Sequence, residues 1–340
     1  MSDQDHFAID DEQVEEEENG LSRRDLLVGG GLLMAGAGLM GAPAAAAATR
    51  RAAVTWKYSV ITHGAGDLFW VVCHNGVNAA AKKLGVKATY SESSNDPQKQ
   101  AQLIDTAVAT KPNGIATSVP NADAIADSLK RAEQANIPVI TLNSGEKDFG
   151  RLGAITHVGQ DEVVAGQGAG TRFKSEGVKH LLIIVHEQGN IGLEQRFSGA
   201  KATFGGNVTR LQVTGVKDLA TTQNEIRSKL QADKSIDSIL GLNPQVGFTA
   251  YQAAQSVKST AKVASFDLST DLLKAIAAGQ ILFAVDQQQY LQGFLPIVFL
   301  YLNNTNANTV GGGKPVLTGP GFVDKSNASK VIALAGKGTR

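Results

Sequence analysis

The sequence predicts an α/β protein made of two doubly wound parallel-sheet lobes joined by three hinge crossings. Short apolar runs alternate with amphipathic stretches of about ten to fifteen residues, which is typical of βαβ units on a parallel sheet. The alternation runs through one series and restarts near residue 160 with the same rhythm. Two similar series favour two similar lobes, and a chain of 340 residues is long enough for both.

The first series starts with an apolar run at residues 58–61, which predicts a buried strand. A glycine-containing loop at 63–67 follows, and then a helix over 69–84 that ends at Gly85. A helix over 97–109 can begin with proline, because the first turn of a helix leaves its N–H groups without partners. The other elements expected here are strands at 87–91, 114–118, 138–142 and 154–158 and a helix at 122–135.

The second series is expected to hold strands at 181–185, 208–213, 236–242, 262–266 and 281–285, and helices at 162–176, 192–204, 221–232, 245–256, 271–278 and 290–303. A strand-like run at 314–318 follows in the tail. The three crossings are expected at 154–160, at 286–287 and near Thr318. The second is expected because the apolar helix that follows it must pack on a sheet. Lobe 1 would then comprise 54–157 and 287–318, and lobe 2 would comprise 158–286 and 319–340.

The N-terminus has the form of an export signal. Residues 22–27, Ser-Arg-Arg-Asp-Leu-Leu, have the twin-arginine form, and the alanines at 44–48 offer cleavage sites. We expect residues 1–48 to be a twin-arginine signal with an acidic leader, and the mature protein to be periplasmic. Beyond residue 48 the chain carries 30 basic and 22 acidic residues without a basic block that contains aromatics, so nucleic-acid binding is not favoured.

Hydrogen-bonding side chains follow the expected strands, at the edge where open α/β sheets bind ligands. Amides and carboxylates with one fixed cation suit a neutral, polyhydroxylated ligand, and the adjacent Phe69 and Trp70 suit its C–H faces. The same residue types also serve as helix caps, turn formers and core aromatics. The strand-end candidates are His63, Asp67, Asn143, Ser144, His186, Asn243, Asp267 and residues 286–289, with Arg196 early on a following helix.

These elements resemble periplasmic sugar-binding proteins of the ribose-binding type, the solute receptors of ABC importers. The similar segments are Asp67-Leu-Phe-Trp, Ile-Pro-Val-Ile-Thr-Leu-Asn-Ser-Gly at 137–145, Gly-Gln-Asp-Glu at 159–162, Arg-Phe-Ser-Gly at 196–199, Phe-Asp at 266–267 and Asp-Gln-Gln-Gln-Tyr-Leu-Gln-Gly at 286–293. The resemblance runs in order from about residue 57 to the end. It implies the type I periplasmic binding fold, a ligand cleft between the lobes, an arginine that holds the sugar and a hinge glutamine that contacts it.

Two departures from the ribose-type pattern leave the ligand open. Asn143 and Ser144 stand where many relatives carry Asp-Arg, and no stacking aromatic lies near residues 217–218. We therefore expect a monosaccharide or a sugar alcohol rather than ribose in particular. The expected ligand contacts are His63, Asp67, Phe69, Trp70, Asn143, Ser144, Arg196, Asn243, Asp267 and Gln287.

Two other functions were weighed. Three imidazoles can hold zinc, and three histidines fall near the expected cleft without ligand-type spacing: His63, His157 and His186. A carboxylate pair among Asp67, Asp267 and Asp286 would suit glycoside hydrolysis, but nothing in the spacing supports it. We expect no catalytic residue, metal or cofactor. The expected partners are a small sugar or polyol and an inner-membrane ABC permease, and the protein is expected to be a monomer.

Overall fold

A computed structural model describes residues 55–340 of the protein. The expected export signal at 1–48 lies outside these residues. The described chain forms two lobes, each built on a six-stranded sheet with helices on both faces, which confirms the predicted fold class. Every helix in this part of the chain is too short or too polar to cross a membrane.

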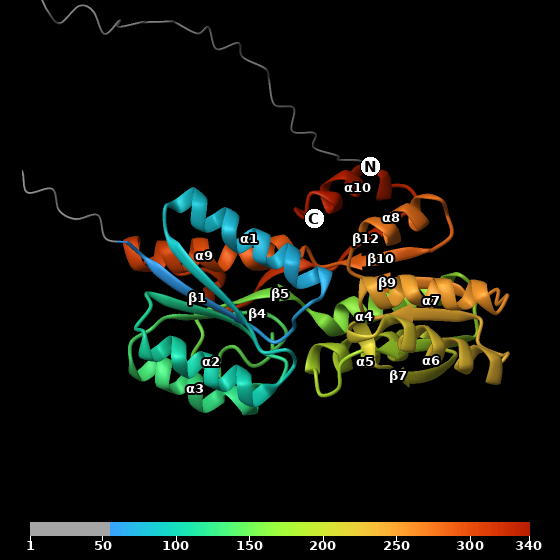
Figure 1. Cartoon of the computed structure of the whole chain (residues 1–340), viewed down its shortest axis with the longest axis horizontal. Helices are drawn as coiled ribbons and strands as arrows, with labels where there is room; N and C mark the ends of the chain where they lie inside the picture. The colour runs from blue at the N-terminus through green and yellow to red at the C-terminus, as the bar shows by residue number, and fades with distance from the viewer. Residues whose placement is uncertain (1–54) are drawn as a thin grey trace, which may run out of the picture. The chain divides into compact units, whose positions relative to one another are not determined.

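Lobe 1 is built on a fully parallel sheet with the strand order β11-β5-β4-β3-β1-β2. Helices α1 and α9 pack side by side over one face, and α2 and α3 cover the other (Figure 1). The strands are β1 (Lys57–Thr62), β2 (Lys87–Glu92), β3 (Gly114–Ser118), β4 (Val139–Asn143), β5 (His157–Gln160) and β11 (Val316–Gly319). The helices are α1 (Leu68–Leu84), α2 (Pro97–Ala109), α3 (Ala122–Gln134) and α9 (Gln289–Asn306).

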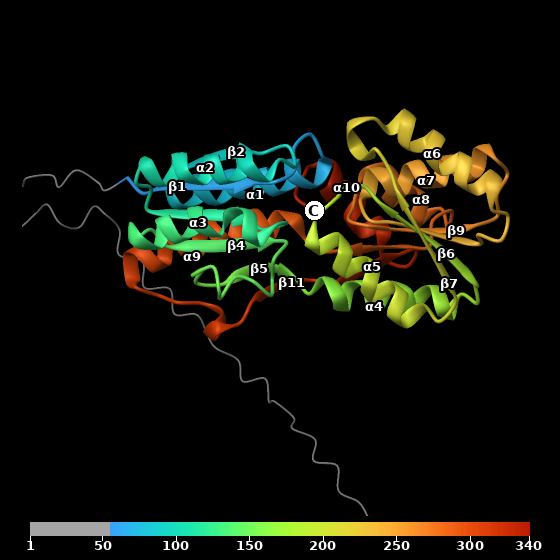
Figure 2. The ribbon, with the colours of Figure 1, turned by 90° about the horizontal axis from the view of Figure 1, so that it is seen from below.

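Lobe 2 has the strand order β12-β10-β9-β8-β6-β7, and all its pairs are parallel except that of β12 with β10. Helices α4 and α5 lie on one face, and α6, α7 and α8 on the other (Figure 2). The strands are β6 (His180–Val185), β7 (Asn207–Gln212), β8 (Ser238–Gly241), β9 (Lys262–Phe266), β10 (Phe283–Asp286) and β12 (Gly321–Asp324). The helices are α4 (Glu162–Ser175), α5 (Ile191–Phe204), α6 (Leu219–Ala232), α7 (Pro244–Ser256), α8 (Thr270–Ala277) and α10 (Ala328–Gly336), and short 3-10 turns lie at Gly215–Lys217 and Gly311–Gly313.

The chain crosses between the two sheets three times: from β5 to α4, from β10 to α9, and from β11 to β12. The exact lobe boundaries stay a prediction, and two of the expected ones fall inside strands. The boundary at 157/158 divides β5, which pairs in the sheet of lobe 1, and the boundary at 318/319 divides β11. The expected strand at 154–158 begins only at His157, and the sequence interpretation did not include β12 or α10.

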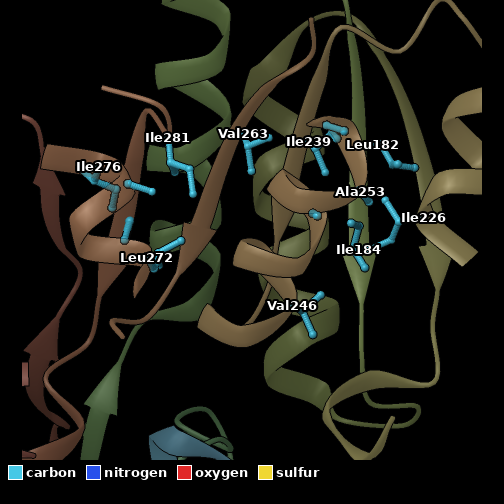
Figure 3. Packing of buried hydrophobic residues seen from close by; sticks show 14 of the residues in the cluster. Leu182, Ile184, Ile226, Ile239, Val246, Ala253, Val263, Leu272, Ile276 and Ile281 are labelled. Carbon is cyan, nitrogen blue, oxygen red and sulfur yellow. The ribbon is translucent and has the colours of Figure 1, made fainter. Parts of the chain in front are cut away.

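The core explains why β6 is almost continuously apolar. Leu182 and Ile184 pack with α6, α7 and α8 (Figure 3). The alternate residues Leu181 and Ile183 pack with α4 and α5. A strand of a parallel sheet is buried on both faces, so both sets of side chains must be apolar. The core holds the strands rigidly, and their carboxyl ends carry the residues of the site.

Candidate functional site

A small polar cavity lies where loops from both lobes meet. All ten residues expected from the sequence line it, together with His186, Glu187, Asn190, Gly192, Leu193 and Leu242. The polar lining comes mainly from the carboxyl ends of β1, β4, β6, β8, β9 and β10, as the strand-end argument requires. Ligand contact by these residues stays a prediction.

Phe69 and Trp70, at the start of α1, line the cavity and also belong to the core of lobe 1. Their rings meet edge to face with centroids 4.8 Å apart, and the ring of Trp70 lies 4.9 Å from that of His63. A Cβ atom at Gly64 would lie 1.8 Å from the indole nitrogen of Trp70, so only glycine fits there. Core packing therefore fixes the aromatic wall of the cavity.

Amides bind carboxylates across the cavity. Asn243 of lobe 2 donates to Asp67 of lobe 1 over 2.6 Å, and each of these side chains also caps its own helix, α7 or α1. Gln287, at a crossing, donates to Asp267 over 2.9 Å and accepts from Asn143 over 3.4 Å. Asp67 and Asn243 therefore both cap a helix and line the cavity, because capping uses one side-chain oxygen and leaves the rest of the group for the contact between the lobes.

Arg196 on α5 is held by Glu162, the first residue of α4, in a buried two-pronged ion pair of 2.6 and 2.8 Å. Its Nη1 donates to the carbonyl of Leu242 over 3.1 Å and lies 3.7 Å from Asp267. The guanidinium also covers the ring of Phe266 at 4.6 Å. Burial opposes the charge of the guanidinium, but Glu162 and Asp267 raise the pKa of Arg196, so the cavity has one fixed cation.

The loop after β6 supplies cavity residues that the site prediction omitted. His186 is a strand-end candidate that is not among the expected contacts, and the sequence analysis does not predict Glu187 or Asn190 at the cavity. Asn190 caps α5 through Gly192 N and donates to Glu187 over 2.6 Å. The strand-end rule would have found Glu187, which is the second residue after β6.

Burial perturbs two carboxyl groups of the cavity. It raises the pKa of Asp67 to about 6 and that of Asp267 to about 7, although Arg196 acts in the opposite direction on Asp267. A folded-state pKa above the ordinary value of 3.8 means that the folded protein binds this proton more tightly than the unfolded chain does. The stability contributed by these protons is complete below about pH 4 and is lost as pH rises to about 7.

We therefore expect Asp267→Asn to become more stable relative to the wild type as the pH rises from about 4 to about 7, because the wild type loses the contribution of this proton over that range. The measurement is the melting temperature of both proteins across this range. Asp271→Asn serves as the control, since Asp271 is exposed on α8. Parallel profiles for the wild type and Asp267→Asn would show that Asp267 does not titrate as its burial requires.

The three candidate histidines do not come together as a metal site. His157 does not line the cavity, because it lies buried within β5 with its Nδ1 3.0 Å from the hydroxyl of Thr141. Within residues 55–340, no group of three His, Cys, Asp or Glu side chains has the geometry of a metal site. Of the three candidate carboxylates, Asp67 and Asp267 line the cavity, whereas Asp286 does not and pairs with Arg340 at 2.6 Å.

The fold and the cavity define a two-lobed binding protein, whose ligand would be enclosed by residues of both lobes. The chain belongs to the periplasmic binding protein family, since the family model of the periplasmic binding protein domain matches residues 58–303. Members of this family act outside the cytoplasm. The predicted family resemblance is therefore confirmed.

Several known proteins are similar over most of the described chain. A carbohydrate transporter from Acidothermus cellulolyticus 11B, crystallised with myo-inositol, is 41% identical, with a TM-score of 0.82 and coverage of 84% of this chain and 100% of that one. A periplasmic sugar-binding protein of an ABC transporter from Legionella pneumophila is 30% identical, with a TM-score of 0.72 and coverage of 77% and 98%. The ribose import binding protein of Escherichia coli K12 is 26% identical over 229 residues, which are 64% of this chain and 75% of the relative.

Proposed function

We propose that the protein is the solute receptor of an ABC importer and that it binds a monosaccharide or sugar alcohol in the cavity between its lobes. The observation that carries this is the lining itself, in which carboxylates, amides and one cation converge from strand ends of both lobes. Carboxylates accept hydroxyl protons, and amides and guanidinium groups donate to hydroxyl oxygens. A neutral polyol has both capacities at every hydroxyl. The myo-inositol complex of the 41% identical relative makes a ring polyol the first ligand to test.

The binding mechanism is ligand-driven closure. In this structure side chains of the two lobes already meet, as in the Asn243–Asp67 hydrogen bond, so the lobes are in contact around the cavity. A ligand that contacts both lobes binds this arrangement better than a separated one and shifts the population toward it. The closed form would then dock on the permease as a monomer, and the ligand would leave chemically unchanged.

Export is the second part of the proposal. The twin-arginine segment at 22–27 would direct the folded protein out of the cytoplasm. Replacement of Arg23 and Arg24 by lysine would then leave the protein in the cytoplasm, as measured by cell fractionation. Unchanged export of the double variant would exclude this route.

The ligand class is tested by a thermal-shift panel of myo-inositol, linear sugar alcohols, pentoses and hexoses on the purified protein. A ligand at a hundred times its dissociation constant adds about 2.7 kcal/mol to the free energy of unfolding, which raises the melting temperature by several degrees. We expect at least one neutral polyol or sugar to do this, and glycine and leucine, as controls, to have no effect. No shift with any carbohydrate would contradict the proposed function, and so would consumption of the compound that binds.

A further inference from the structure

The loop between β6 and α5, residues 186–190, carries two buried groups that the cavity description leaves without a role. His186 and Glu187 both line the cavity, and their side chains are 5% and 10% exposed. The Nδ1 atom of His186 has no hydrogen-bond partner among residues 55–340. A buried polar atom without a partner is unusual and costly, so its place in the wall of a ligand cavity points to a ligand group.

Glu187 is also a contact between the lobes. Its Oε1 accepts from Asn95 of lobe 1 over 3.2 Å, and its Oε2 lies 3.6 Å from Nε2 of His63, also of lobe 1. The loop is fixed from its other end, because Asn190 donates to Glu187 and lies 3.2 Å from His63. The amide of Ile191 donates to the carbonyl of Pro120 in lobe 1 over 3.0 Å. The loop therefore holds lobe 2 against lobe 1 at the edge of the cavity.

These side chains also separate two spaces. His63, Glu187 and Asn190 line both the cavity and a neighbouring hollow, which is otherwise bounded by the β2–α2 loop, the start of α2 and the β3–α3 loop of lobe 1 and by Gln188 and Gly189. Glu187 thus lies in the wall that closes the ligand cavity on this side. A ligand hydroxyl that donates to the Glu187 carboxylate would bind the same group that contacts Asn95 and His63 of lobe 1. Ligand binding and the contact between the lobes would therefore share one side chain.

The protonation states of the pair suit this role. Burial alone would raise the pKa of Glu187, but His63, His186 and the Asn190 amide outweigh it and lower this pKa well below its usual range. Burial lowers the pKa of His186 to about 4. Near neutral pH the pair is therefore a carboxylate, which only accepts hydrogen bonds, beside a neutral imidazole, which has one donor and one acceptor nitrogen.

We propose that His186 and Glu187 form a subsite for two neighbouring hydroxyl groups of the ligand, and that Glu187 couples their recognition to lobe closure. Glu187 accepts the proton of one hydroxyl, and the free nitrogen of His186 bonds the other. The chemical class is a neutral polyol with hydroxyls on adjacent carbons. This subsite rests on the proposed function and adds to it the residues that select the ligand.

The test is calorimetry of myo-inositol, and of its monodeoxy derivatives, with the wild type and Glu187→Gln. Hydrogen bonds to charged groups correspond to a loss of affinity of about 10- to 100-fold when one partner is removed. We expect Glu187→Gln to lose affinity for myo-inositol by this factor. One monodeoxy derivative lacks the hydroxyl that donates to Glu187. We expect the wild type and the variant to bind this derivative with equal affinity. The matched control is Glu194→Gln. Glu194 lies on α5 and forms an exposed ion pair with Arg210 of β7, so this variant should bind as the wild type does.

The outcomes separate the claims. Equal binding of myo-inositol by the wild type and Glu187→Gln overturns the subsite and leaves the proposed function intact. If Glu187→Gln loses the same factor of affinity for every derivative, the subsite is also overturned, since Glu187 would then act on lobe closure alone. We expect that uniform loss from Asn95→Ala, which removes only a contact between the lobes. A wild type that binds neither myo-inositol nor any polyol of the panel refutes the proposed function and the subsite together. If Glu187→Gln fails to fold, Glu187→Asp replaces it in the test. This variant keeps the charge but shortens the side chain by one methylene, and we expect it to lose affinity for myo-inositol and to bind one monodeoxy derivative as the wild type does.

Discussion

Replacement of Arg196 by alanine is expected to abolish polyol binding and to lower the free energy of unfolding by about 3–5 kcal/mol. The guanidinium is 5% exposed and its partner Glu162 is 1% exposed, so the substitution leaves a carboxylate buried without its cation. It also removes the donor to Leu242 and the group that covers Phe266. Chemical denaturation measures the stability, and calorimetry below the melting temperature of the variant measures the binding.

The matched control is Arg210→Ala, which removes the same side chain from an ion pair with Glu194. Both partners of that pair are more than a third exposed, Arg210 at 35% and Glu194 at 39%, and exposed pairs contribute about 0–1 kcal/mol. We expect this variant to bind normally and to lose little stability. If Arg196→Ala retained the affinity of the wild type, the cation would have no part in ligand binding and the arrangement described for the cavity would be wrong.

The second large effect is expected from Gly199→Ala, at the contact between α4 and α5. A Cβ atom at Gly199 would lie 2.3 Å from the carbonyl oxygen of Val163, and one at Gly166 would lie 2.3 Å from that of Arg196. Alanine favours an isolated helix by about 1 kcal/mol, but here the clash is with backbone, which cannot rotate away. Overpacking of this kind costs about 1–3 kcal/mol or more, so we expect net destabilisation.

Gly199→Ala should also weaken ligand binding, because α5 carries Arg196 and α4 carries Glu162. When the helices separate, the ion pair that positions the cation is stretched. Gly150→Ala is the control, since a Cβ atom there meets nothing within 4 Å, and its effect should stay within about 0.5 kcal/mol. Denaturation midpoints and calorimetry on the two variants check both points. A Gly199→Ala protein as stable as the wild type would show that α4 and α5 are free to move apart.

Much of the fold was accessible from the sequence, because each βαβ unit has a local signature. The buried strand β6 is an unbroken apolar run, and α1 ends at Gly85, which adopts φ 67° as a helix-ending glycine does. The tail was harder. Strand β12 has only four residues and follows β11 after a single residue, and its antiparallel pairing with β10 depends on a partner 35 or more positions away. Helix α10 has only nine residues, is largely exposed and has no side-chain hydrogen bond at its N-cap, so it lacks the start signal that marks most of the other helices.

The site was predictable in so far as parallel strands present their carboxyl ends together. That rule brought Asp67, Asn143 and Asp267 to one cavity although they lie in three distant segments. It could not show which residue would meet which across the lobes, such as Asn243 with Asp67, because those contacts depend on how the two lobes fold against each other. Glu187 is the second residue after β6, and the strand-end prediction there covers only the first, His186.

The most direct test of the central claim is a crystal structure of the protein grown with myo-inositol. The account predicts one intact ring in the cavity, with hydroxyl groups within hydrogen-bond distance of carboxylates from both lobes and of Arg196. A ring bound elsewhere while the cavity between the lobes holds none, or a chemically altered ring, would contradict it.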